Sequence, residues 1–90
     1  MTTITVTAEH IARGEREDCE GCPVALAIQE AFPDLSYSIV GPEEITMGPL
    51  EAEISLPTPR EAVFFILAFD NGEPVRPFAF ELDYPPEVAA

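Results

Sequence analysis

The sequence predicts one α+β domain over residues 1–90, in which two main helices and a short N-terminal helix pack on one face of a four- to five-stranded, mainly antiparallel sheet. One observation is the alternation of apolar and polar residues in several segments, which indicates strands with one buried and one solvent-facing side. Such strands are typical of antiparallel sheets, because parallel strands are covered on both faces and are apolar throughout. A second observation is the helical spacing of apolar residues in the segments between these strands.

The N-terminal half begins with a strand, because Ile4 and Val6 alternate with threonines. Thr7 is a suitable N-cap for a short helix that follows. Pro23 suits the first turn of the next helix, and Pro33 stops it. The predicted elements of this half are a strand over 3–7, helices over 8–13 and 23–32, and short strands over 37–39 and 43–47.

The C-terminal half contains the strongest helix start in the chain. Thr58 is the expected N-cap, Pro59 takes the first helical position, and Glu61 completes a capping box. The segments on either side of this helix alternate between apolar and acidic or small residues, as strands do. The predicted elements are a strand over 50–56, a helix over 59–70, a strand over 78–84 and a loose tail over 85–90.

The charge of the chain is strongly one-sided, with 17 acidic residues, 4 basic residues and a formal net charge of −13. This balance disfavours direct binding to nucleic acids or anionic membranes, which are polyanions, and favours a basic protein as partner. The first residues lack the regions of a signal peptide, and the longest apolar run, 62–69, is too short to span a bilayer. We therefore expect a cytoplasmic protein, in which cysteines are more often free thiols or metal ligands than disulfides.

Two pairs of acidic residues lie in predicted strands, Glu51 with Glu53 and Glu81 with Asp83. Residues two apart on a strand point to the same side at a separation of about 6.8 Å, which matches every second phosphate along one DNA strand. Rows of such carboxylates would imitate DNA and occupy a basic, nucleic-acid-binding surface of a host protein. The alternative is a solvated acidic face that keeps a small protein soluble. A second acidic patch is predicted from Glu15, Glu17, Asp18 and Glu20.

The two cysteines, Cys19 and Cys22, are spaced so that their sulfur atoms can meet or share a metal ion. With His10, the only histidine, they supply three zinc ligands, and an acidic residue or a second subunit would have to supply the fourth. A redox role is the second interpretation, because a helix N-terminus favours the thiolate of Cys22, although nearby carboxylates oppose it. The favoured interpretation is that Cys22 is a small buried residue and that the pair fixes the loop before the helix.

No catalytic constellation can be assembled from the remaining residues. A second histidine, a nucleophile elbow and a glycine-rich phosphate loop are all missing from the sequence. The sequence therefore predicts no enzyme and, apart from zinc, no cofactor.

The helix predicted over 59–70 is apolar around its whole circumference, which is typical of a helix buried on all sides. One sheet covers only one side of a helix. Phe65 and Phe69, one turn apart, are therefore either covered by the other helices of the same chain or available as an interface for self-association or for another partner.

The segment 4–28 carries His10-Ile11, Gly14, Asp18-Cys19, Cys22-Pro23 and Val24-Ala25. In these residues the chain resembles a group of small proteins from actinobacteria and their phages, which share a strand, an HI-x-x-G turn and a C-x-x-C-P-[VI]-A helix start. The group has no known activity, so the resemblance implies a source and no catalytic chemistry. It covers about the first third of the chain.

Together these features predict a small acidic, non-enzymatic binding protein, such as a phage-type modulator or inhibitor of a basic host protein. One alternative is a structural or assembly protein that forms a homo-oligomer through helix 59–70. Another is a small metal- or thiol-binding protein that uses Cys19 and Cys22.

Overall fold

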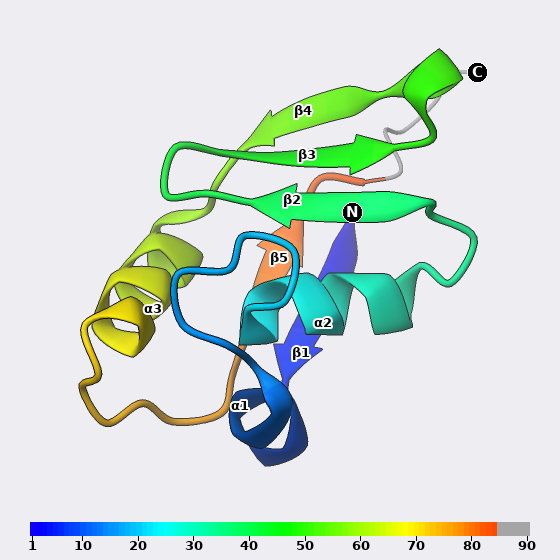
Figure 1. Cartoon of the computed structure of the whole chain (residues 1–90). Coiled ribbons are helices and arrows are strands. Elements are labelled where there is room, and N and C mark those ends of the chain that lie inside the picture. Colours follow the sequence, from blue (N-terminus) through cyan, green and yellow to red (C-terminus); the bar gives the residue numbers. More distant parts are fainter. Residues whose placement is uncertain (85–90) are drawn as a thin grey trace.

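The protein, as a computed structural model, is described over residues 1–84 (Figure 1). The predicted tail over 85–90 lies outside the described residues. The strands are β1 (Thr2–Val6), β2 (Tyr37–Val40), β3 (Glu44–Gly48), β4 (Ile54–Pro57) and β5 (Phe78–Leu82). The helices are α1 (Ala8–Arg13), α2 (Pro23–Ala31) and α3 (Arg60–Asp70), with a short 3₁₀ helix, η1 (Leu50–Ala52), between β3 and β4.

The strands of the described region form two antiparallel sheets. β1 pairs with β5, with Thr2 opposite Leu82 and Val6 opposite Phe78, and the other sheet has the order β2-β3-β4. The α+β class and the antiparallel pairing are therefore confirmed, but the five strands are divided between two sheets and do not form one. α2 connects the two sheets, because it packs against both β1 and β2 (Figure 1).

The hydrophobic core surrounds α2. Val24 and Ile28 of this helix are fully buried, as are Ile4 of β1 and Ile45 of β3. The core therefore receives side chains from both sheets, because each sheet turns its apolar side toward α2. Further buried core residues are Val6, Cys22, Ala25, Ala27, Val40, Met47, Ala62, Phe65, Ile66, Phe80 and Leu82.

The prediction of a strand over 50–56 is wrong in its first half. Leu50–Ala52 form η1, and the pairing between β3 and β4 begins only where Ile54 lies opposite Met47. Because β3 and β4 are antiparallel neighbours, the chain must reverse direction between them, and the residues after Pro49 make that reversal. The Ala52 amide donates to the Pro49 carbonyl at 3.0 Å, which closes the turn. The apolar residue Leu50 is 80 % exposed, so it does not lie on a buried strand face as the apolar–polar alternation predicted.

The start of α3 also differs from its prediction. Pro59 occupies the N-cap position, without a side-chain capping bond, and the Thr58 hydroxyl donates to the Gly41 carbonyl at 2.7 Å. The Thr58 amide donates to the Glu43 carbonyl as well. The Thr58 hydroxyl is therefore bonded to the turn between β2 and β3 and does not cap α3. No helix in residues 1–84 has the length and apolar character needed to cross a membrane.

Candidate functional site

The loop between α1 and α2, residues 14–22, carries the cysteine pair and the densest acidic sequence; we call it the Cys loop. Its two ends are tied together, because the Glu15 amide donates to the Gly21 carbonyl at 2.9 Å. The Cys19 carbonyl accepts from the Val40 amide at 2.7 Å, so the loop lies along the outer edge of β2. The first bond closes the base of the loop, and the second holds its centre against the domain.

Two acidic side chains, one in the loop and one at the end of α3, accept hydrogen bonds that fix the backbone of this loop. Asp18 Oδ1 accepts from the amides of Glu20 and Gly21, both at 3.0 Å. The Glu17 amide donates to Asp70 Oδ1 at 2.9 Å, which links the loop to the end of α3. Glu17 has a φ of +57°, in the left-handed region that residues other than glycine seldom adopt. The bond to Asp70 therefore fixes a backbone conformation that is unfavourable by itself.

A pocket of about 260 Å³ lies between the Cys loop, the turn after β2 and the end of α3. Its apolar floor includes Val40 and Ile66, and the carboxylates of Glu17, Asp18 and Asp70 stand around it. Its full lining is Glu17, Asp18, Cys19, Cys22, Val40, Gly41, Pro42, Ile66 and Asp70. The combination of an apolar floor and carboxylates suits the side chain of an arginine or lysine, whose alkyl stem is apolar and whose head is cationic.

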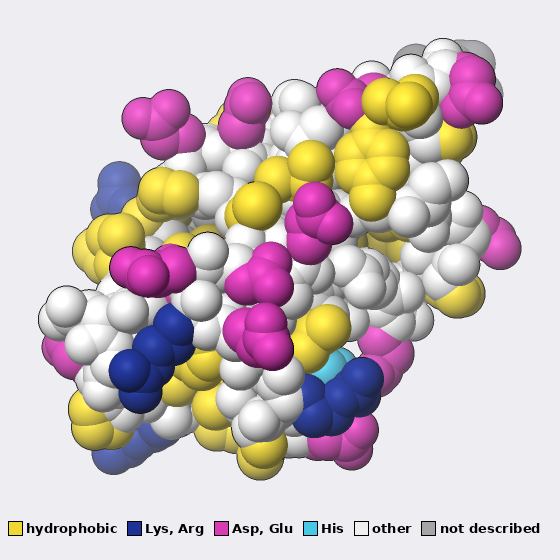
Figure 2. Space-filling model, viewed as in Figure 1, with side chains coloured by type: hydrophobic (Ala, Val, Ile, Leu, Met, Phe, Trp, Pro, Cys, Tyr) yellow, Lys and Arg dark blue, Asp and Glu magenta, His cyan; other side chains and the backbone are white. Residues whose placement is uncertain are grey.

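The acidic side chains of the Cys loop gather on one face of the molecule. Glu15, Glu17 and Glu20 are exposed, and Asp18 is half-buried. Figure 2 shows acidic side chains over the centre of this face, with arginine side chains below them. Arg16, the basic residue of the loop, is close to Gly72 beyond α3 and does not line the pocket. The structure therefore brings the predicted second patch together as one surface.

Asp70 belongs to this surface, although no sequence pattern predicted it there. It is 53 residues away from Glu17, its hydrogen-bond partner. In the sequence it was the last residue of a predicted helix, and no local pattern connects it with the Cys loop. Only the packing of α3 beside that loop places it at the pocket.

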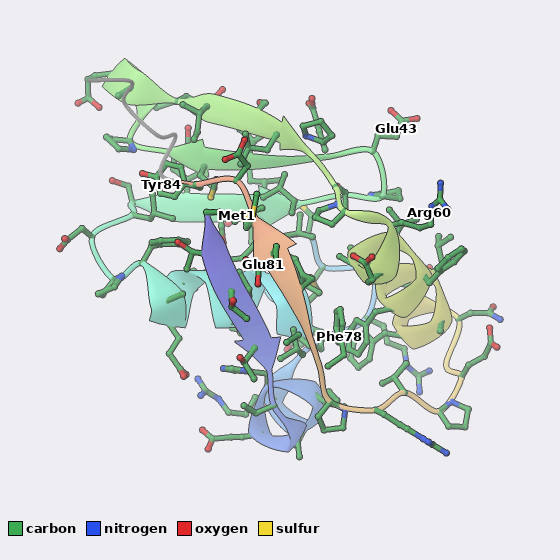
Figure 3. The ribbon with its side chains drawn as sticks, turned by 180° about the vertical axis from the view of Figure 1, so that it is seen from behind. Met1, Glu43, Arg60, Phe78, Glu81 and Tyr84 are labelled. Carbon is green, nitrogen blue, oxygen red and sulfur yellow. The ribbon has the colours of Figure 1, made fainter. Side chains whose placement is uncertain are left out.

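The other predicted acidic residues lie elsewhere. Glu51 is in η1 and Glu53 follows it, whereas Glu81 lies on β5 with Asp83 just beyond that strand. β4 and β5 belong to different sheets, so the two pairs do not form one set of adjacent rows. Figure 3 shows Glu81 on the outer side of the β1–β5 pair, where its carboxylate accepts from the Thr3 hydroxyl. The two-residue strand spacing does not apply to Glu51 and Glu53, because η1 replaces the strand there.

Glu53 instead accepts a hydrogen bond from the Tyr37 hydroxyl. The Tyr37 ring lies over Gly48, its partner on β3, so closely that a Cβ atom at this position would overlap the ring. Gly48 therefore leaves the space that lets Tyr37 reach toward Glu53. The hydrogen bond to this carboxylate is the main cause that raises the pKa of Tyr37 to about 12, and desolvation and then the charges of Glu53 and Glu51 act in the same direction.

Replacing Glu53 by glutamine is expected to lower the pKa of Tyr37 from about 12 toward its ordinary value of about 10. The phenol donates to Glu53 only when protonated, so this contribution to stability is present below about pH 10 and is lost as the pH rises through about 12. A titration followed at 295 nm in a Tyr84→Phe background measures Tyr37 alone, since the chain has 2 tyrosines. Glu51→Gln is the control and should move the midpoint less. An unchanged midpoint in Glu53→Gln would contradict the assignment.

The two cysteines have different environments. Both are free thiols; Cys19 is exposed, whereas Cys22 is buried. Cys22 occupies the N-cap of α2, where its Sγ accepts from the Ala25 amide at 3.4 Å. Burial raises the pKa of the Cys22 thiol, the charges of Asp70 and Asp18 act in the same direction, and the backbone amides of Ala25 and Val24 partly oppose them. Cys22 is therefore a helix cap with little thiolate character, which does not favour a nucleophilic role.

His10 lies on α1 and is buried, with both ring nitrogens engaged. Its Nδ1 accepts from the Thr7 amide at 3.0 Å, and its Nε2 lies 3.0 Å from Glu30 Oε2. An acceptor at Nδ1 leaves the ring proton on Nε2, so the neutral imidazole donates to Glu30. Within residues 1–84, no group of three or more His, Cys, Asp or Glu side chains is placed to hold a metal ion. His10 therefore joins α1 to α2 and is not directed toward Cys19 and Cys22.

The Phe-rich helix α3 turns one side toward the core and another toward solvent. Phe65 is only 7 % exposed, and its ring stacks on Phe78 of β5 at 4.7 Å and on Phe69 at 6.0 Å. Phe69 is half-buried, whereas Phe64 and Leu67 are exposed. The interface expected at Phe65 and Phe69 is therefore largely internal, because the aromatic face of β5 covers it. An apolar surface on α3 consists of Phe64 and Leu67.

The residues that carry the resemblance form one structural unit. His10 bonds to α2, and Gly14 lies against the Pro23 ring so closely that a Cβ atom would come within 2.5 Å of it. Cys22 caps the helix that Pro23 opens. No family model matches this sequence, and no curated protein or solved structure matches the chain.

Proposed function

We propose that this protein is a small, non-enzymatic binding protein that uses the Cys-loop face to engage a basic surface of another protein. One observation carries the proposal: three carboxylates, from Glu17, Asp18 and Asp70, line a pocket with an apolar floor. Two further carboxylates, from Glu15 and Glu20, are exposed on the same loop. A formal net charge of −13 agrees with this choice of partner, since it attracts basic proteins over long distances.

The pocket supports a specific contact with an arginine or lysine of the partner. The alkyl stem of such a residue would lie on Val40 and Ile66, and its cationic head would meet Glu17 and Asp70. The loop is held by the Asp18 and Cys19 hydrogen bonds, so little conformational entropy is lost when a partner binds. An exposed loop without these bonds would bind more weakly for the same charge.

A basic surface that binds the carboxylates of this loop can also bind the phosphates of nucleic acids, because both are negatively charged. The protein would then act as a modulator or inhibitor by occupying that surface, as a phage-type protein does with a host target. The proposal that rows of carboxylates imitate the regular spacing of DNA phosphates has less support, because Glu51 and Glu53 do not lie on a strand. Glu51, Glu53, Glu81 and Asp83 contribute to the long-range field around the molecule.

Reversing the three exposed carboxylates of the Cys loop tests the proposal. With an arginine-rich peptide as probe, Glu15→Arg/Glu17→Arg/Glu20→Arg is expected to raise Kd more than about tenfold, because each contact contributes about 0.2–1 kcal/mol and reversal adds repulsion. Calorimetry at low and high salt gives the affinities, and wild-type binding should weaken as salt rises. The same reversal should prevent capture of a basic protein from a lysate at low salt.

The matched control is Glu51→Arg/Glu81→Arg/Asp83→Arg, which changes the net charge equally on other surfaces. It is expected to change Kd by less than about threefold, since it affects only the long-range field. Equal losses in the two triple variants would show that net charge alone governs binding and would exclude a Cys-loop site. Undiminished binding by the Cys-loop variant would exclude it as well.

A further inference from the structure

The sheet edges of the described region differ in how they are protected from another strand. The outer edge of β2 is occupied by the Cys loop through the bond from Val40 to Cys19. β4 ends in Pro57 and follows Glu53, and both residue types block strand addition. β5 carries Glu81 and is flanked by α3, which packs on it through Phe65 and Phe78.

The outer edge of β1 has no such protection. Its sequence, Thr-Thr-Ile-Thr-Val, contains no charge, proline or glycine, and its residues are β-branched types that favour strands. Within residues 1–84, the backbone groups of Thr2–Val6 bond only to β5. Figure 3 shows no strand on the side of β1 that faces away from β5. Main-chain groups along that side are therefore free to pair with a strand from another molecule.

We propose that two copies of the chain pair through β1, antiparallel about a twofold axis, to form the four-stranded sheet β5-β1-β1-β5. With Ile4 opposite Ile4 of the second copy, Thr3 faces Thr5 and Thr2 faces Val6. A twofold axis perpendicular to the sheet keeps the buried side of β1, with Ile4 and Val6, on the same side in both copies. The apolar layers that cover the two α2 helices then become continuous.

A second copy fits this edge because the strand is complementary to itself. Each strand supplies the same five residues, so a twofold pair matches every free main-chain group of one copy with one in the other. Copies with a charge of −13 repel each other, but β1 carries no carboxylate, so the pairing places no two carboxylates directly opposite each other. The nearest carboxylate across the sheet, Glu81, is one strand away and bonded to Thr3. Because the β1–β5 pair and the Cys loop lie on opposite sides of the molecule, the dimer leaves that loop free (Figures 1 and 3).

Light scattering with size-exclusion chromatography tests the pairing. The mass is expected to rise with concentration from 9.8 kDa toward twice this value. Thr5 is exposed and lies opposite Ala79 within the monomer, so Thr5→Glu leaves the β1–β5 ladder intact. In the dimer each new carboxylate would face Thr3 of the second copy, diagonal to the other new carboxylate and in the same row as Glu81 of the second copy. This concentration of negative charge is expected to raise the dimer dissociation constant about tenfold.

The register is tested by crosslinking in a Cys19→Ser background. An equimolar mixture of Thr3→Cys and Thr5→Cys proteins should form a disulfide dimer on mild oxidation by glutathione disulfide, because residues directly opposite have the Cα separation that a disulfide needs. Either protein alone should crosslink much less. A mass of 9.8 kDa at all concentrations would overturn the proposal. So would a dimer that Thr5→Glu leaves intact, or one that Phe64→Ser dissociates.

Discussion

Phe65→Ala is expected to lower the free energy of unfolding by about 3–5 kcal/mol, as removal of a buried phenylalanine does elsewhere. Phe65 is 7 % exposed and stacks on both Phe78 and Phe69, so truncation leaves a cavity between α3 and β5 and ends both aromatic contacts. A loss of this size is comparable with the entire stability of a small domain. Urea denaturation followed by circular dichroism measures it. If the variant does not fold, Phe65→Leu provides the measurable intermediate.

Phe64→Ala is the matched control, because it removes the same side chain from the neighbouring position of α3. Phe64 is 67 % exposed, so the change is expected to alter stability by no more than about 0.5 kcal/mol. Equal losses in the two variants would mean that both faces of α3 are buried in solution. That result would contradict the orientation of the helix described above.

Gly14→Ala is expected to destabilise the domain by about 2–3 kcal/mol and to lower Tm by about 10–20 °C. The reason is space and not backbone conformation, since φ and ψ of Gly14 are −69° and 151°, which alanine adopts freely. A Cβ atom at this position would lie 2.5 Å from Cγ and Cδ of Pro23 and 2.8 Å from its nitrogen. Pro23 is rigid and buried at the start of α2, so the helix or the Cys loop must move. Thermal unfolding followed by circular dichroism gives the change.

Two further variants separate this clash from a general effect of removing glycine. At Gly41, a Cβ atom meets only the Glu44 carbonyl at 3.5 Å, an ordinary contact, so Gly41→Ala is expected to be neutral or slightly stabilising. Pro23→Ala removes the ring that causes the clash, so Gly14→Ala should cost less in that background. A Gly14→Ala protein as stable as wild type would show that the two segments are not in contact.

Local features of the sequence were sufficient to predict those elements whose structure depends on neighbouring residues. Thr7 caps a helix with the expected bounds, Ala8–Arg13, and His10 completes the capping box in place of the usual acidic residue or glutamine. Pro23 opens α2, β5 lies within its predicted segment, and β1 is displaced by one residue from its predicted segment, 3–7. In each case the signal comes from residues within one or two turns or from regular alternation.

Predictions failed where a distant contact competes with a local preference. Thr58 would cap α3 by its sequence, but its hydroxyl is used by Gly41, 17 residues earlier. Alternation over 50–56 suggested a strand, yet the chain reverses there because β4 pairs with β3. The pocket depends on the bond between Glu17 and Asp70, which no spacing in the sequence specifies. These features depend on tertiary packing, which a local sequence pattern does not specify.

The pairing of β1 with β5 also has a consequence for how the chain folds. Thr2 and Leu82 are partners although almost the whole chain separates them, whereas β2 and β3 are joined by a short turn. Closing a loop about ten times longer costs about 2 kcal/mol more chain entropy. During synthesis, Ile4 and Val6 lack the strand that completes their sheet until Phe78–Leu82 has been made. A fragment that stops between residues 58 and 77 contains all the strands of the three-stranded sheet but lacks β5, the partner of β1.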